Sequence, residues 1–232
     1  MMVQNATLVL SDLTRMNVSE AVLSRSSTRA FLKNPVENKL IKEILKKSSR
    51  SASGGNLQPW KIYILNNASM KNFLSFQQKF NKPETSEYDI YPPKLKEPYR
   101  TYRYELGEEM YSILGIPRED KESRMKQVLK NFEFFGAPAG LFCYVDKQMG
   151  PPQWSDLGMF LSTFMLLAKE AGLDTCAQEA WSIKNRCVSE FVSASSDEML
   201  FCGMAIGYAD KNAPINTLKS SRSPLNEWAK FI

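Results

Sequence analysis

The chain has 232 residues, of which 43% are hydrophobic and 24% charged, so it is long enough for one sizeable domain and has an ordinary globular composition. Its 30 basic and 25 acidic residues give a dispersed net charge of +5, which argues against a nucleic-acid-binding protein and suits a small anionic ligand. The absence of histidine excludes a Ser-His or Cys-His catalytic pair and removes the commonest zinc ligand. Redox chemistry carried by a cofactor survives this exclusion.

The cysteines and the N-terminus indicate where the protein works. The sequence contains no Cys-x-x-Cys pair, and we expect its cysteines to be reduced core residues of a cytoplasmic protein: Cys143, Cys176, Cys187 and Cys202. Residues 1–10 lack the basic and apolar regions of a secretory signal, and no stretch reaches the roughly 18 apolar residues of a membrane span. We expect residues 1–18 to form an irregular arm and residues 19–232 a single domain.

Two helices, two polar turns and a strand are predicted in the first part of the chain. One helix ends near Ser24, and a second begins at residues 35–36 because apolar residues then recur at helical spacing. A polar turn follows each helix, at residues 25–31 and 53–60. Residues 61–66 then form an apolar strand.

A long proline-rich loop follows a helix predicted for residues 69–80. Residues 81–98 contain four prolines, and structureless loops of this length inside a domain are usually functional lids or disordered. Two helices are predicted next, at residues 100–114 and 118–134, with Gly115-Ile116-Pro117 breaking them apart.

The remainder of the chain alternates apolar strands with helices. Residues 139–145 predict a buried strand, and residues 154–171 a helix that is apolar almost all round, so that it lies in the core or against a second subunit. A short strand and loop at 175–181, a helix at 183–192 and a strand at 198–208 complete the pattern.

Both polar turns offer hydrogen-bond donors to a ligand. Arg25 and Arg29 enclose three hydroxyl residues, and a guanidinium fork matches a phosphate, although a solvated basic turn has the same composition. In the second turn two glycines allow a close backbone approach to a ligand, although a plain turn is the alternative. The polar side chains of this second turn are Ser53, Asn56 and Gln58, beside Gly54.

Taken together, these turns resemble the opening of the FMN-dependent nitroreductase family. The family has an Arg-x-Ser-x-Arg turn, here residues 25–29, and a Ser-Gly-rich loop ending in Gln-Pro-Trp, here residues 53–60. The resemblance runs from about Ser19 to the C-terminus, and later landmarks follow in the family's order: Asn131-Phe132, Phe135-Gly136-Ala137-Pro138, Asp156-Leu157-Gly158, Gly172-Leu173, Gln178-Glu179, the segment 203–208 and Arg222.

The resemblance implies an α+β fold with three α/β/α layers, a mostly antiparallel sheet flanked by helices, and an intertwined homodimer with shared active sites. It also implies bound FMN and ping-pong hydride transfer from NADH or NADPH to a nitroaromatic compound or a quinone. The cofactor carries the hydride chemistry, so no catalytic side chain and no metal is expected.

Residue by residue, the resemblance assigns Arg25 and Arg222 to the FMN phosphate, with Ser26 or Ser27 adding a hydroxyl donor. Arg29 matches the position that stabilises negative charge at the flavin N1, and Asn131 lies close to the position that contacts the pyrimidine. The backbone of Glu179 and Ala180, next to Gln178, falls near the flavin N5. The 53–58 loop, with Ser53, Gly54, Asn56 and Gln58, reaches the flavin partly from the second subunit.

The resemblance implies that residues 81–105 form a lid that covers the flavin and shapes the substrate pocket. Substrate contacts are therefore expected at Tyr88, Tyr91, Arg100 and Arg103, although surface packing is the alternative for each. Three other functions stay open on the sequence. The same flavin scaffold supports dehalogenation and enone or flavin reduction. A flavin-binding protein without turnover, or a structural protein that has lost its cofactor, would share many of the same residues.

Overall fold

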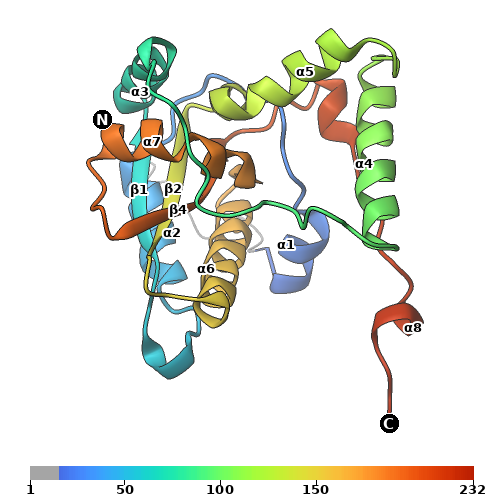
Figure 1. Ribbon diagram of the computed structural model, residues 1–232. Coiled ribbons are helices and arrows are strands. Elements are labelled where there is room, and N and C mark those ends of the chain that lie inside the picture. The colour runs from blue at the N-terminus through green and yellow to red at the C-terminus, as the bar shows by residue number, and fades with distance from the viewer. Residues whose placement is uncertain (1–15) are drawn as a thin grey trace, which may run out of the picture.

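The computed structural model describes residues 16–232 and shows an antiparallel sheet between two layers of helices (Figure 1). The strands are β1 (Lys61–Asn66), β2 (Ala139–Asp146), β3 (Asp174–Gln178) and β4 (Glu198–Gly207), and they lie in the order β1-β2-β4-β3. The predicted three-layer α+β arrangement is confirmed. Of the predicted arm, residues 1–15 lie outside the described residues.

Alternation of side chains along β2 explains why both faces of the sheet are covered. Leu141 and Cys143 point into one core layer, Phe142 and Tyr144 into the other, and all four are 0% exposed. The first face is covered by α2 (Asn38–Ser48) and α6 (Pro151–Glu170), and the second by α3 (Ala68–Lys79), α7 (Asn185–Val192) and the 3-10 segments η2 (Lys130–Gly136) and η3 (Glu179–Lys184).

Aromatic rings fill the second core layer. The Trp181 indole is fully buried, with its ring centroid 4.7 Å from that of Phe134 and 5.2 Å from that of Phe142. This packing requires glycine at position 203, because a Cβ added at Gly203 would lie 2.3 Å from Cδ1 of Trp181. Trp181 follows Ala180 directly, so the same packing fixes the chain just beyond β3.

The central helix α6 is buried on one face and exposed on the other. Its inward residues, among them Leu157, Phe160 and Phe164, pack on the sheet. On its outer side runs a stripe at helical spacing that a single chain leaves exposed: Ser155, Gly158, Met159 and Ser162. Of the two expectations for this helix, burial in the core therefore holds for one face.

Most predicted elements lie within one to three residues of their observed bounds, but the helix predicted for residues 118–134 is wrong. It ends early, as α5 (Lys121–Leu129), and continues as η2, in which Phe134 and Phe135 take left-handed φ values of 50° and 52°. This turn buries both rings in the core. The helix α1 (Val18–Ser24) ends at Ser24 as predicted and begins at a capping box between Asn17 and Glu20.

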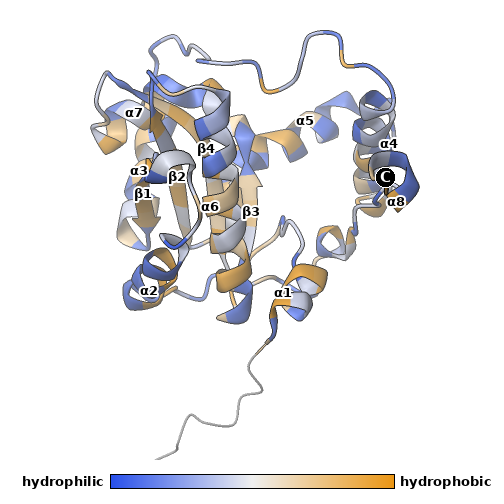
Figure 2. Cartoon of the chain, turned by 90° about the horizontal axis from the view of Figure 1, so that it is seen from below, coloured by the Kyte–Doolittle hydropathy of each residue, from blue (hydrophilic) through white to orange (hydrophobic). Residues whose placement is uncertain are grey.

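The long loop and the helix after it project from the layered body. Residues 81–98 form no helix or strand, as predicted, and lead across β4 to α4 (Tyr99–Ile113), which has no buried residue and stands apart in two perpendicular views (Figures 1 and 2). The C-terminal tail, with η4 (Pro214–Thr217) and α8 (Leu225–Trp228), runs beside α4 and away from the sheet. Among the helices within residues 16–232, none has the length and apolarity to cross a membrane.

Candidate functional site

The first polar turn lies along the open edge of β3. Ser27 forms a parallel bridge with Thr175, and the Thr28 N–H donates to the Thr175 carbonyl at 3.0 Å. Helix α1 ends immediately before, where Arg25 is its C-cap. The sheet therefore fixes the backbone that carries both Arg25 and Arg29.

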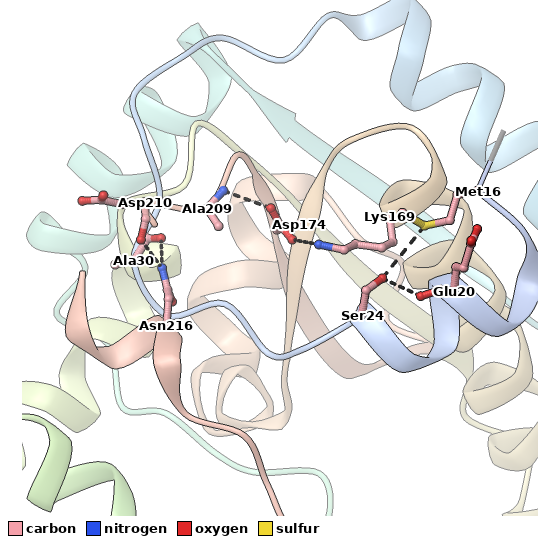
Figure 3. A network of polar contacts seen from close by, with 9 residues as sticks. All are labelled: Met16, Glu20, Ser24, Ala30, Lys169, Asp174, Ala209, Asp210 and Asn216. Carbon is pink, nitrogen blue, oxygen red and sulfur yellow. Dashed lines mark hydrogen bonds and ion pairs between the residues drawn. The ribbon is translucent and has the colours of Figure 1, made fainter. Parts of the chain in front are cut away.

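Asn216 fixes the end of this turn from the far end of the sequence (Figure 3). Its Oδ1 accepts the Arg29 N–H at 2.8 Å, and its Nδ2 donates to the carbonyls of Ala30 at 2.8 Å and Asp210 at 2.9 Å. Sequence reasoning missed Asn216. Its only signal is a polar side chain in a short segment after a proline, which many turns share.

We expect Asn216→Ala to lower the free energy of unfolding by about 2 kcal/mol, because it leaves the Arg29 amide and two carbonyls without their partner. Asn212→Ala is the matched control, since Asn212 is exposed and its side chain makes no such contacts in the described structure. Urea unfolding of both variants checks this, and equal midpoints would contradict the role of Asn216.

The two guanidinium groups at this edge carry uncompensated positive charge. Within residues 16–232 neither Arg25 nor Arg29 forms an ion pair, and the Arg29 guanidinium donates one hydrogen bond, to the Ser27 carbonyl at 3.2 Å. Both lie near the Cys176 thiol on β3: burial raises the pKa of Cys176 to about 11, and the positive charges of Arg29 and Arg25 oppose that rise. Unpaired guanidinium groups beside Ser26 and Ser27 form a donor set that fits a phosphate.

The burial of the cysteines predicts how slowly the native protein reacts with a thiol reagent. All four cysteines are buried and free, and burial raises the pKa of Cys176 to about 11 and those of Cys187 and Cys202 to about 12, from an ordinary 9.0. Because only the thiolate reacts, we expect negligible labelling of native protein by a thiol reagent at about pH 8 and complete labelling after unfolding. The raised values stabilise the fold below pH 9.0, and this contribution is lost as pH rises towards 11 to 12. Rapid labelling of the native protein at about pH 8 would contradict the prediction that its thiols are protonated and buried.

A second cluster lies at the other end of β3. The Gln178 side chain is 2% exposed, and its Nε2 donates to the Asn131 carbonyl at 2.7 Å. Its Oε1 accepts from the Trp181 indole at 3.4 Å. Glu179 and Ala180 follow at once, and partial desolvation raises the pKa of the Glu179 carboxyl. The structure therefore brings Asn131, Gln178 and the 179–180 backbone together.

The 53–58 loop lies elsewhere, near the start of α6. The Gly54 N–H donates to the carboxylate of Asp156 at 3.3 and 3.2 Å. At the other end of α6, Lys169 pairs with Asp174 at 2.8 Å, beside the Arg25 turn (Figure 3). Asp156 and Lys169 are 13 residues apart, roughly 20 Å along a helix. One chain therefore does not bring the loop to Arg25.

Arg222 lies with two of the predicted lid residues. With Tyr91 and Arg103 it lines a hollow of about 610 Å³ between α4 and residues 220–227, and the Arg103 guanidinium lies 4.1 Å from the Tyr91 ring centroid. The Arg222 guanidinium donates to oxygens of Ser220 and Ser221. In the described part of the chain, no contact joins Arg222 to Arg25.

The other two predicted lid residues make contacts within the chain. Tyr88 donates its hydroxyl hydrogen to the Phe201 carbonyl and stacks on the Phe201 ring, so it anchors the long loop to β4. Burial raises the pKa of the Tyr88 hydroxyl. Arg100 pairs with Glu97 at 2.5 Å on the exposed side of α4.

Comparison with known proteins shows to which family the chain belongs. A family model described as the nitroreductase family matches residues 22–208. The chain belongs to the nitroreductase family. No group of three or more side chains that could hold a metal ion lies together within residues 16–232 of this nitroreductase.

Its relatives are similar over nearly their whole length. The chain is 34% identical over 213 residues to the 4-nitrobenzoate reductase of Pseudomonas putida, covering 91% of this chain and 93% of that protein. It is 32% identical over 223 residues to the nitrobenzene nitroreductase of Ectopseudomonas oleovorans, covering 93% and 96%. Among solved structures, the FMN and NADPH-dependent nitroreductase NfnB from Sphigopyxis sp. strain HMH superposes with a TM-score of 0.88 at 38% identity, covering 93% and 99%.

Proposed function

We propose that this nitroreductase binds FMN and uses NADH or NADPH to reduce nitroaromatic compounds or quinones by a ping-pong hydride transfer. The observation that carries the proposal is the pair of uncompensated guanidinium groups fixed at the β3 edge. They occur in a chain whose relatives, matched over more than 90% of its length, include a 4-nitrobenzoate reductase and a nitrobenzene nitroreductase. FMN, when bound, supplies the site that accepts and returns the hydride.

The chain's own residues bind and orient the cofactor in this proposal. Arg25 holds the phosphate, with Ser26 or Ser27 adding a hydroxyl donor, and Arg29 places positive charge at the ring end. Asn131 meets the pyrimidine edge, and the buried Gln178 holds Asn131 in place by donating to its carbonyl. The backbone N–H groups at Glu179 and Ala180 face the position where hydride arrives, so no protein acid or base is needed for that step.

A homodimer completes the site. The exposed stripe on α6 contains small residues and Met159, which is 41% exposed, and a two-fold axis across it would set two copies of α6 antiparallel. That arrangement brings the 53–58 loop of one chain, at the start of α6, to the Arg25 turn of the other, at its end. It would also cover exposed apolar side chains of α1 and the tail: Val18, Val22, Leu23, Leu225, Trp228 and Phe231.

The projecting parts of the chain then supply the remaining contacts. In the dimer the tail carries Arg222 to an FMN phosphate, and residues 81–105 form the lid of the acceptor pocket. Tyr91 and Arg103, which stack on each other, face the acceptor, and Arg100 lines a neighbouring hollow with Arg103. Tyr88 supports this lid by anchoring the long loop to β4. Four free, buried cysteines support a reducing, cytoplasmic environment.

The visible spectrum of the purified protein tests this proposal. Flavin absorbance that bleaches with anaerobic NADH or NADPH and recovers with a nitroaromatic acceptor is the expected result. Bound flavin that stays oxidised would favour a flavin-binding protein without turnover, and recovery only with an enone, a halogenated compound or free flavin would favour another reaction on the same scaffold. Protein that takes up no FMN would overturn the proposal.

A further inference from the structure

A buried carboxylate lies beneath the 53–58 loop without a counterion. Asp156 is 4% exposed, and within residues 16–232 it forms no ion pair. Its two oxygens accept from one donor, the Gly54 N–H, at 3.3 and 3.2 Å. Burying a carboxylate with so few partners costs folding free energy, so stability alone does not account for Asp156 at this place.

The loop above it has a backbone shape that needs support. Gly55, Asn56 and Gln58 take left-handed φ values of 56°, 58° and 50°, a conformation that glycine and asparagine tolerate but that is unfavourable for Gln58. Inside the loop, Ser53 Oγ accepts the Gln58 N–H at 3.0 Å. Residues 54–58 are exposed, so packing of their side chains does not hold them in place.

Helix α6 holds both ends of this loop, one turn apart. At the exit, the Trp60 ring stacks on Phe160 with centroids 4.9 Å apart and planes at 20°. At the entry, Asp156 holds Gly54, and positions 156 and 160 lie on the same side of the helix. The exit is anchored by apolar packing, whereas the entry is anchored by the Asp156 hydrogen bonds.

We propose that Asp156 is a positioning residue: its carboxylate holds the Gly54 N–H and thereby keeps the 53–58 loop in the shape that contacts the flavin. The inference rests on the proposed function, in which that loop reaches the FMN bound by a partner chain. Asp156 touches the loop backbone and not the cofactor, so its effect on the ligand passes through Gly54.

Removing either side of this contact tests the proposal. We expect Asp156→Ala to raise the FMN dissociation constant of the dimer about tenfold, the effect of losing hydrogen bonds to a charged group, and Asp156→Asn to restore part of it through its remaining oxygen. Gly54→Pro removes the donor and is expected to have the same effect. Combined with Asp156→Ala it should add nothing further, because both act on one interaction.

A control variant separates this role from general destabilisation. Asp120→Ala removes a helix cap on α5 and should lower the melting temperature without changing FMN affinity. FMN affinity equal to that of the wild type in Asp156→Ala would overturn the inference, as would affinity losses of Asp156→Ala and Gly54→Pro that add fully in the double variant. In either case, turnover by the wild-type protein would leave the proposed function standing. Wild-type protein that binds no FMN would instead sink the proposed function itself.

Discussion

Replacing Arg25 with alanine is expected to raise the dissociation constant for FMN by roughly ten- to one-hundredfold, which corresponds to the loss of a hydrogen bond to a charged group worth about 1.5 to 3 kcal/mol. Arg25 forms no ion pair within residues 16–232, so its charge is free to meet a phosphate. Its backbone is set by the end of α1, which means that the side chain can be removed without disturbing the turn. Titration of apoprotein with FMN, followed by flavin fluorescence, measures the change.

Matched variants make this result specific to the guanidinium. Arg25→Lys keeps the charge but loses the planar fork, so we expect an intermediate loss of affinity. Arg50→Ala removes the same charge from an exposed position outside the site and should leave the dissociation constant unchanged. A similar loss in Arg50→Ala would assign the effect to overall charge and contradict a specific phosphate contact.

Gly203→Ala is expected to have the largest effect on the fold, lowering the free energy of unfolding by about 3 kcal/mol, as overpacking of a dense core does. The new Cβ would lie 2.3 Å from Trp181 Cδ1 and 2.9 Å from its Cγ. Trp181 is fully buried among other rings and has no room to move aside. Trp181 directly follows Ala180, whose backbone is proposed to face the flavin, so flavin affinity should fall together with stability. Urea unfolding and FMN titration on the same preparations measure both.

The control for this variant is a glycine in open space. Nothing lies within 4 Å of a Cβ added at Gly107, in the middle of α4, so Gly107→Ala should raise stability by about 0.5 to 1 kcal/mol through helix propensity alone. Gly203→Ala with the stability of the wild type would show that the Trp181 layer repacks, which is the opposite of what its burial implies.

Local patterns were sufficient for most of the fold. Strand β1 and the strand and helix positions after residue 135 follow from runs of apolar residues and their spacing, because each pattern reports which face an element buries. The break between α5 and η2 could not be predicted in this way. The left-handed Phe134 and Phe135 are set by the aromatic core that receives their rings, and no neighbour in sequence signals it.

The family, the absence of histidine chemistry and the two polar turns follow from residue types and short spacings in the sequence. Which of these residues contact one another depends on the tertiary structure. It ties Arg29 to Asn216, 187 positions away, and sets Asp156 under Gly54, 102 positions away. It also separates the 53–58 loop from Arg25 along α6. Such contacts join residues that are far apart in the sequence, and they depend on how the helical layers pack on the sheet. Local residue patterns carry no information about which distant residues become neighbours.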